Sequence, residues 1–337
     1  MKLGIYTATL NGHRKSYCKT FLEIFSSVRI DGFSLINHDG PVIFLMIEES
    51  FFKFVIVSVL RSVIGKETYG LLFRPKPVVD GLSLRLKLKK YILILLKRLD
   101  KIGVILIMPT HLDPGFSDIS KSWIYDMQLW DLTSEHDDYF SGLKNGFYKH
   151  ECLYSRIQSS KKGRPVIGAI GAQNGIKRFD FFVNEYKKSI SLRKRFLFAF
   201  AGKVGEFREL IKPFSEVGGF SLDAFITEKE LLQIYAVSDL VWAFYADTYD
   251  QASGIFGRSV QLGIPVVVRE GSLIHKHCVI DGIPHIPLSH DGLDEIAHMN
   301  IPEVDIALGK SFRESFKKQS VLNLNQLIGI DIENTND

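Results

Sequence analysis

The sequence has little cysteine. Cys18, Cys152 and Cys278 are its only cysteines, and they lie far apart in a chain of 337 residues. Their number and spacing exclude a cysteine metal cluster and a disulfide framework. We therefore expect a reducing, cytoplasmic setting.

The sequence also has little net charge and no long apolar run. Its 42 Lys and Arg against 38 Asp and Glu leave a formal charge of +4, which is too small to indicate nucleic acid as a partner. Lys53, Arg61 and the basic residues near 87–98 interrupt the apolar stretches, so none reaches the roughly 20 residues that span a bilayer. The first residues read as a strand rather than a secretory signal. We expect a protein that is soluble or lies on a membrane surface.

What the sequence does contain is an ordinary globular composition, 46% hydrophobic and 24% charged. This excludes a disordered or fibrous chain. The length predicts about two domains.

Strand-like apolar runs alternate with amphipathic stretches, which predicts an α/β fold with parallel sheets. Expected strands lie at 3–9, 41–45, 69–73, 104–108, 165–170, 195–201, 239–245 and 264–268. Expected helices lie at 14–28, 49–64, 86–101, from about 179, at 227–237 and at 252–263. Residues 155–164 are polar and basic without an apolar stripe, so we expect a linker there between domains 1–154 and 165–310. A C-terminal helix and tail are expected at 311–337.

The segment from Asp250 to Val268 carries the most chemical information. Ser253 and Gly254 stand at the expected start of a helix, where unpaired backbone N–H groups and a partial positive charge favour a phosphate. Gly254 also lets a ligand approach the backbone closely. On these residues alone, an ordinary crossover helix that ends at Gly263 is an equally good interpretation.

Four segments together resemble the donor-binding domain of GT-B glycosyltransferases of the family 4, or group 1, type. They are 165–177 (PVIGAIGAQNGIK), 195–203 (ending in FAGK), 227–241 (TEKELLQIYAVSDLV) and 250–268 (ending in GIPVVV). The resemblance implies two Rossmann-like domains whose parallel sheets face a central cleft. Residues 1–154 would bind the acceptor, and residues 165–310 would bind a nucleoside-diphosphate sugar.

The resemblance implies a donor site made of Gly171, Lys177, Lys203, Ser253, Gly254 and Arg258. Members of this group often carry two glutamates eight residues apart, and here Asp250 and Arg258 occupy those positions. Asp250 is left to contact a sugar hydroxyl as a catalytic candidate, whereas Arg258 suits a phosphate.

A second departure lies after the first strand's glycine. Ala172 and Gln173 stand where an arginine is usual. A diphosphate leaving group needs stabilising positive charge, which Lys177, Lys203 and Arg258, together with the amides at Ser253 and Gly254, could supply. Neither a metal nor a cofactor is expected.

Candidates in the first half come from loops after two expected strands and from an aromatic, acidic stretch. Gly12 and Arg14 are expected near the acceptor, and His13, His111 and Asp113 are candidates for catalysis, with His111 or Asp113 as a general base. Asp126 and Trp130 have the composition of a sugar-stacking site. The alternative is a turn with surface residues for the first loop and plain packing for Trp130.

Residues 84–102 raise the question of a membrane surface. Leu84, Leu88, Tyr91, Leu95 and Leu99 fall on one helical stripe, and seven Lys and Arg residues occupy the rest of the circumference. A basic amphipathic helix can lie on an anionic membrane. A crossover helix packed into the core is the alternative, and the two can coexist.

The leading hypothesis is a glycosyltransferase that moves a sugar to a hydroxyl of a glycan or lipid-linked glycan, with a role in cell-surface polysaccharide synthesis. It would be cytoplasmic, or peripheral on the inner face of the membrane. A nucleotide-sugar epimerase and a non-catalytic, glycosyltransferase-like binding subunit are the alternatives. Donor base, linkage and anomeric outcome stay open.

Overall fold

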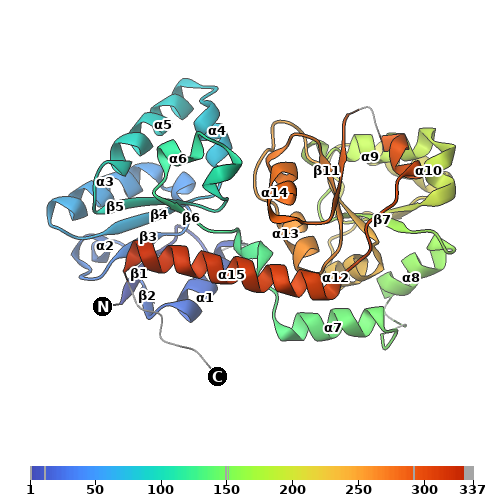
Figure 1. Cartoon of the computed structure of the whole chain (residues 1–337), viewed down its shortest axis with the longest axis horizontal. Coiled ribbons are helices and arrows are strands. Elements are labelled where there is room, and N and C mark those ends of the chain that lie inside the picture. The colour runs from blue at the N-terminus through green and yellow to red at the C-terminus, as the bar shows by residue number, and fades with distance from the viewer. Residues whose placement is uncertain (1, 11–12, 149, 151, 291–292, 330–337) are drawn as a thin grey trace. The chain divides into compact units, whose positions relative to one another are not determined.

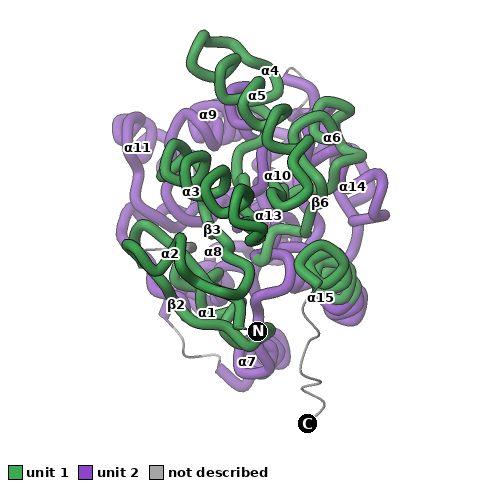
Figure 2. The backbone as a smooth tube through the Cα atoms, turned by 90° about the vertical axis from the view of Figure 1, so that its left-hand side faces the viewer, with its two compact units in different colours: residues 1–127, 315–337 green, residues 128–314 purple. Residues whose placement is uncertain are grey.

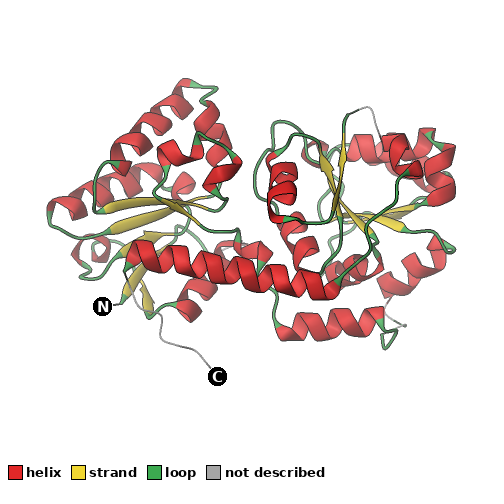
Figure 3. Cartoon of the chain, viewed as in Figure 1, coloured by secondary structure: helices red, strands yellow, loops and turns green. Residues whose placement is uncertain are grey.

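The computed structural model describes residues 2–10, 13–148, 150, 152–290 and 293–329. The chain forms two compact units: unit 1 contains residues 1–127 and 315–337, and unit 2 contains residues 128–314 (Figure 2). Each unit has its own parallel sheet with helices around it (Figures 1 and 3).

Unit 1 has a six-stranded parallel sheet in the order β2-β1-β3-β4-β5-β6. Its strands are β1 (Leu3–Tyr6), β2 (Ser27–Arg29), β3 (Val42–Phe44), β4 (Thr68–Leu72), β5 (Ile102–Leu106) and β6 (Ser122–Trp123). Its helices are α1 (His13–Ile24), α2 (Ser34–Asn37), α3 (Phe51–Val63), α4 (Pro75–Asp80), α5 (Leu84–Lys97) and α6 (Phe116–Ile119), with short turns of 3-10 helix at η1 (Ile47–Glu49) and η2 (Thr110–Leu112).

Unit 2 has a second six-stranded parallel sheet in the order β12-β11-β10-β7-β8-β9. Its strands are β7 (Val166–Ile170), β8 (Leu197–Ala201), β9 (Phe220–Leu222), β10 (Leu240–Ala243), β11 (Val266–Arg269) and β12 (His285–Leu288). Its helices are α7 (Ser134–Lys144), α8 (Cys152–Lys161), α9 (Phe179–Lys188), α10 (Ile190–Arg195), α11 (Ile211–Glu216), α12 (Glu228–Val237), α13 (Gly254–Gln261) and α14 (Leu273–Asp281), with 3-10 turns η4 (Gly175–Lys177), η5 (Arg208–Leu210) and η6 (Leu293–His298).

Two elements lie at the division between the units. The turn η3 (Met127–Leu129) starts at the last residue of the first segment of unit 1 and continues into unit 2. Helix α15 (Ile306–Ile328) belongs to unit 2 through Glu314 and to unit 1 from Ser315. The C-terminal helix predicted at 311–337 therefore begins earlier, and the predicted tail after 329 lies outside the described residues.

Every predicted strand and helix is present, with bounds shifted by a few residues. Helix α12 begins with the predicted capping box, in which Thr227 and Glu230 satisfy each other's backbone N–H groups. The predicted linker at 155–164 differs from the structure, because helix α8 covers residues 152–161. Leu153, Tyr154 and Ile157 of this helix are buried. Leu153 and Tyr154 precede the polar run, so the sequence of that run alone does not show the apolar face of the helix.

Arg61 fastens several loops of unit 1 from inside the core. Its side chain on α3 is fully buried, and its guanidinium donates to the backbone carbonyls of Leu35 (2.9 Å), His38 (2.9 Å) and Gly40 (2.7 Å). It also donates to Oγ1 of Thr68 on β4, at 3.1 Å. Burial lowers the pKa of Arg61. The guanidinium thus replaces water as the hydrogen-bond donor for carbonyls that no strand pairs.

Replacing Arg61 by Met should leave these buried carbonyls without donors, at about 1–3 kcal/mol each. We expect the free energy of unfolding to fall by about 3 kcal/mol or more, measured by urea titration. The matched control is Arg85→Met, because Arg85 is exposed on α5. Its change should stay within about 0.5 kcal/mol. Equal effects of the two substitutions would contradict this account of Arg61.

Candidate functional site

Two glycines bring the first two strand ends of unit 2 together. Gly171 follows β7 with φ +75°, and Gly202 follows β8 with φ +145°. The backbone N–H of Gly171 donates to the carbonyl of Ala201 at 2.9 Å. A Cβ on Gly202 would collide with the carbonyl group of Gly171. Only glycine permits this backbone-to-backbone approach, which brings main-chain groups to the carboxyl end of the sheet, where parallel α/β sheets bind ligands.

Lys177 lies at the same end of β7. Its ammonium donates to the carbonyl of Ile170 at 2.8 Å. A Cβ on Gly171 would lie 3.4 Å from Nζ of Lys177 and 3.7 Å from Cδ1 of Ile255, so the ammonium sits beside the first turn of α13. Burial lowers the pKa of Lys177 to about 8. This is the behaviour of a cation withdrawn from water without a carboxylate to compensate it.

The backbone around Lys177 is held from three sides. The side chain of Asn174 accepts from the N–H of Lys177 at 3.1 Å. The carbonyl of Lys177 accepts from the indole of Trp242 on β10 at 3.0 Å, and that of Ile176 accepts from the N–H of Ala246 at 2.9 Å. The loop after β7 is therefore tied to β10, and the ammonium is positioned before any ligand binds.

Gln173 is a site residue that sequence reasoning did not select. Its side chain is 1% exposed, and its Nε2 donates to the carbonyl of Gly171 at 2.8 Å. Its backbone N–H donates to the carbonyl of Lys203 at 2.8 Å. Its Oε1 is buried without a hydrogen-bond partner. Gln173 thus holds the glycine turn where the related motif has arginine, and Lys203 beside it is exposed.

Ser253 and Gly254 begin helix α13, as predicted. Ser253 is the N-cap residue, but its Oγ bonds to the hydroxyl of Tyr245 rather than to the first turn of the helix. The Ser253 side chain therefore does not cap the first turn of α13, and a helix start of this kind is a place where an anion can bind. Gly254 packs against the side chain of Gln128, with which a Cβ would collide. The tyrosine contact was not visible in the sequence, because it joins the end of β10 to a residue beyond the following loop.

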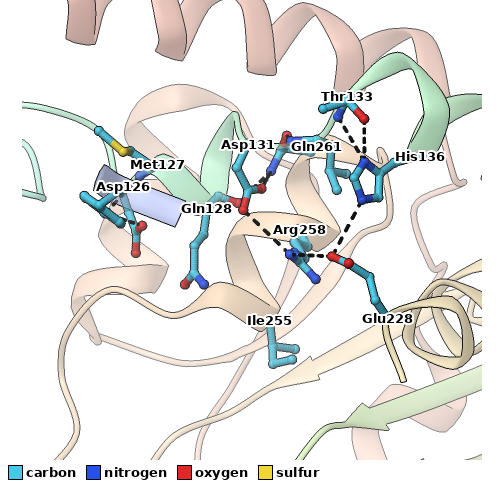
Figure 4. Close-up of polar contacts among 12 residues, drawn as sticks. Asp126, Met127, Gln128, Asp131, Thr133, His136, Glu228, Ile255, Arg258 and Gln261 are labelled. Atoms are coloured by element: carbon cyan, nitrogen blue, oxygen red, sulfur yellow. Dashed lines mark hydrogen bonds and ion pairs between the residues drawn. The ribbon is translucent and has the colours of Figure 1, made fainter. Parts of the chain in front are cut away.

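Arg258, which the sequence predicts as a phosphate ligand, contacts two carboxylates. Its guanidinium lies 3.3 Å from Glu228 and 3.7 Å from Asp131 (Figure 4). His136 lies 3.6 Å from the same Glu228 carboxylate. The side chain of Asp131 is 13% exposed, and that of Arg258 is 20% exposed. Two carboxylates therefore already compensate the charge of Arg258, unlike that of Lys177.

Asp250 fastens the loop before α13. Its Oδ1 accepts from the backbone N–H of Leu273 at 2.7 Å, at the start of α14, and lies 3.9 Å from Arg269. These contacts orient the loop onto the neighbouring helix. They give Asp250 a positioning role that its predicted contact with a sugar hydroxyl did not include.

Asp113 and His111 of unit 1 have different surroundings. Asp113 is 8% exposed, and its carboxylate lies 2.9 Å from Nζ of Lys76 and accepts from the N–H of Gly115. Burial of Lys76 lowers its pKa, yet the hydrogen bonds that its ammonium donates to Asp113 and Asp80 raise the pKa overall, to about 12. Asp113 is thus an anchor for α4 rather than an exposed base. His111 is exposed and packs edge-on against Trp123.

The remaining predicted acceptor residues are buried or undescribed. Asp126 is 7% exposed and accepts from the hydroxyl of Tyr17 at 2.7 Å. Trp130 is 5% exposed, so its ring offers no open face for stacking a sugar. Their burial favours packing over an open sugar-binding surface. His13 and Arg14 are the first residues of α1, and Gly12 lies outside the described residues.

In the described part of the chain, no three His, Cys, Asp or Glu side chains gather as metal ligands. The groups that lie at the end of β7 are a desolvated ammonium and bare backbone at two glycines, with the Ile255 side chain from the first turn of α13 beside Gly171. This set is suited to binding an anion.

The glycine contact can be tested through stability. Gly202→Ala should destabilise the fold for two reasons: alanine is strained at this positive φ, and its Cβ would displace the Gly171 carbonyl. Gly218→Ala is the matched control, since Gly218 has φ +91° but nothing within 4 Å of an added Cβ. We expect about 1–2 kcal/mol of lost unfolding free energy for Gly218→Ala and about 2 kcal/mol more for Gly202→Ala. Equal losses in urea titrations would show that the close approach has no energetic weight.

No protein-family model and no curated protein sequence matches the chain. Solved structures do match the chain. The N-terminal domain of Candida albicans trehalose-6-phosphate phosphatase aligns with a TM-score of 0.54 and 9% identity, covering 96% of this chain and 83% of that one. WaaG, a glycosyltransferase involved in lipopolysaccharide biosynthesis, gives 0.52 and 12%, covering 98% and 99%.

A UDP-forming α,α-trehalose-phosphate synthase from Burkholderia xenovorans, solved in complex with glucose-6-phosphate, gives a TM-score of 0.52 and 11% identity, covering 86% and 71%. At these identities the likeness concerns the fold. The predicted fold class is confirmed: the chain has the α/β architecture of GT-B proteins, with two six-stranded parallel sheets.

Proposed function

We propose that this protein is a GT-B glycosyltransferase that binds a nucleoside-diphosphate sugar at the carboxyl end of the unit 2 sheet. The observation that carries the proposal is Lys177, a half-buried lysine beside bare glycine backbone, in which desolvation lowers the pKa to about 8. A cation held out of water has a strong preference for an anionic ligand, because the ligand restores the lost stabilisation of its charge. The likeness to a UDP-forming synthase and to WaaG supports the same class.

The diphosphate would occupy the end of β7. Lys177 would contact it directly, the amides at Gly254 and Ile255 would donate to it, and the exposed Lys203 would approach from the neighbouring loop. During sugar transfer the bond from the anomeric carbon to the diphosphate breaks, and negative charge grows on the leaving oxygen. Fixed donors that face this charge lower the barrier. We propose that protein groups supply them without a metal ion and that no other cofactor takes part.

Gln173 would position this machinery. Its Nε2 already holds the Gly171 carbonyl, and its free Oε1 can accept a hydroxyl or N–H of the donor. Arg258, whose charge is compensated by Asp131 and Glu228, would act through the packing of α13. The acceptor is proposed to be a hydroxyl of a glycan or lipid-linked glycan, as in cell-surface polysaccharide synthesis, in keeping with the involvement of WaaG in lipopolysaccharide biosynthesis.

A non-catalytic binding subunit is the second candidate. Two positions expected for catalysis and two expected for acceptor binding support it: Asp250 and Asp113 make structural contacts, and Asp126 and Trp130 are buried. Such a subunit would bind a nucleotide sugar without consuming it. Turnover of the bound donor separates the two candidates.

Thermal-shift screening of the purified chain with UDP, GDP, ADP, dTDP and CMP tests the proposal. We expect one nucleoside diphosphate to raise the melting temperature, and Lys177→Met to weaken its binding about 10–100-fold, the effect of losing a charge-assisted hydrogen bond.

The pH profile isolates Lys177. A lysine with a pKa of about 8 is charged below pH 8 and neutral above it, so affinity for the nucleotide should fall between pH 7.5 and 9.5, as measured by isothermal titration. Lys177→Met should give weaker and flatter binding. Lys203→Met is the matched control and should weaken binding while it keeps the slope. An unchanged slope in Lys177→Met, or no binding of any nucleotide, would refute the assignment.

We further propose that unit 1 attaches peripherally to an anionic membrane, which places the protein at the inner face of the cytoplasmic membrane. The predicted stripe on α5 is exposed: Leu84 by 85%, Leu88 by 54% and Tyr91 by 67%. The buried residues of α5 are Leu93 and Leu96, which lie off the stripe, so the helix packs inward and keeps its apolar stripe outward.

Helix α3 extends this surface. Phe52 is 62% exposed, Ile56 59% and Val63 81%. The two helices are neighbours, because Nζ of Lys89 on α5 lies 5.2 Å from the ring centroid of Phe51 on α3. Exposed apolar side chains interleaved with lysines and arginines match the two attractions of an anionic bilayer. Within the described residues, no helix is long and apolar enough to cross a membrane.

Co-sedimentation with vesicles tests the membrane proposal. We expect binding to vesicles that contain phosphatidylglycerol, weaker binding to pure phosphatidylcholine, and a loss at high salt. Leu88→Asp with Tyr91→Asp should reduce binding about tenfold or more. Phe225→Asp is the control, since Phe225 is 87% exposed in unit 2. Equal binding of both variants would contradict attachment through α5.

A further inference from the structure

A polar pocket lies in unit 1, at the edge strand β6. It has a volume of about 420 Å³, within the range of small-molecule sites. Lys97 at the end of α5, Thr110, Lys121, Ser122, Trp123 and Asn323 on α15 line it. None of the candidate donor residues takes part, so the pocket is an additional feature of the molecule.

Two lysine ammoniums face this pocket without a carboxylate partner in the described structure. Nζ of Lys97 donates to the carbonyl of Ser117, and Nζ of Lys121 donates to the carbonyls of Leu99 (2.6 Å) and Asp100 (3.3 Å). These bonds leave two donors on Lys97 and one on Lys121.

The two cations are also close enough to repel each other. The pKa of Lys121 is lowered, first by burial and also by the charge of Lys97, against a raising effect of Asp100. An anion between the two ammoniums would relieve both the desolvation and the repulsion.

The other walls of the pocket favour a hydroxylated molecule over a simple ion. Thr110 and Ser122 contribute hydroxyls, and the half-exposed indole of Trp123 contributes an aromatic surface. The side chain of Asn323 donates to the carbonyl of Trp123 at 2.9 Å, and the rings of His111 and Tyr125 pack at 87° and 90° to the indole. The tryptophan is therefore held in place. The pocket is also far larger than a lone phosphate requires.

We infer that this pocket binds a saccharide that carries a phosphate or carboxylate group, with the anionic group between Lys97 and Lys121 and the sugar ring beside Trp123. Hydroxyls, an aromatic ring and two uncompensated cations are the complement of such a ligand. The site is independent of the proposed nucleotide site, since its residues belong to unit 1 and it needs no turnover.

Intrinsic fluorescence offers a direct readout. Trp130 and Trp242 are 5% and 3% exposed, so Trp123 is the tryptophan that a ligand in solution can reach. We would titrate the full chain with glucose 1-phosphate, glucuronate, glucose and inorganic phosphate, and confirm each affinity by isothermal titration. Glucose 1-phosphate or glucuronate should bind at least about tenfold more tightly than glucose or inorganic phosphate and should change the emission.

The double variant Lys97→Met, Lys121→Met should weaken that binding about tenfold or more. Lys87→Met, an exposed position on α5, controls for charge alone, and Lys177→Met controls for binding in unit 2. Lys87→Met should leave the affinity unchanged, and melting temperatures would verify folding. Loss in Lys177→Met but not in the double variant would overturn the inference. Equal affinity for inorganic phosphate would overturn the saccharide assignment, and no binding of any probe would overturn the site.

Discussion

The close approach of Gly171 and Gly202 is the constraint on which the candidate site depends. Parallel pairing of β7 with β8 brings their carboxyl ends to one edge, and the two glycines let the following loops meet through backbone alone. A side chain at Gly202 would push the loops apart, because its Cβ would collide with the Gly171 carbonyl. With the loops together, the carbonyl of Ile170 can accept from the Lys177 ammonium, and Gln173 can bridge to the loop after β8.

This arrangement holds the Lys177 ammonium in a desolvated position. Three other cations withdrawn from water are compensated: Arg258 by two carboxylates, Lys76 by Asp113 and Asp80, and Arg61 by a ring of backbone carbonyls. The Lys177 ammonium donates to the carbonyl of Ile170, and burial lowers its pKa to about 8. Stability alone gives no reason to retain such a group, whereas a diphosphate ligand does. The contrast among these cations supports the assignment of Lys177 rather than Arg258 to the phosphate.

The sequence predicted the central strands and missed the edges. The strands that it predicted are buried apolar runs, whereas β2, β6, β9 and β12 are the outer strands of the two sheets, short and partly exposed. Such strands have no continuous apolar run to detect. The sequence predicts a linker at 155–164, where the structure has most of helix α8, because the buried face of this helix begins before the polar stretch.

The site was predictable in its local parts and unpredictable in its distant contacts. Glycine turns, Lys177 and the start of α13 follow from short motifs. The partners of Arg258 and Asp126 come from other elements, and the desolvation of Lys177 depends on how α13 and β10 pack against it. Burial of Trp130 likewise depends on tertiary packing. An aromatic and acidic stretch such as the one with Asp126 and Trp130 can therefore be buried in the protein as well as line a sugar-binding site.

Hydrogen exchange with mass spectrometry, with and without the nucleoside diphosphate that binds, tests the central claim most directly. The account predicts slower amide exchange at 171–177, 202–205 and 253–258, with little change in unit 1. Protection confined to unit 1, or a bound nucleotide that leaves these three segments unchanged, would contradict it.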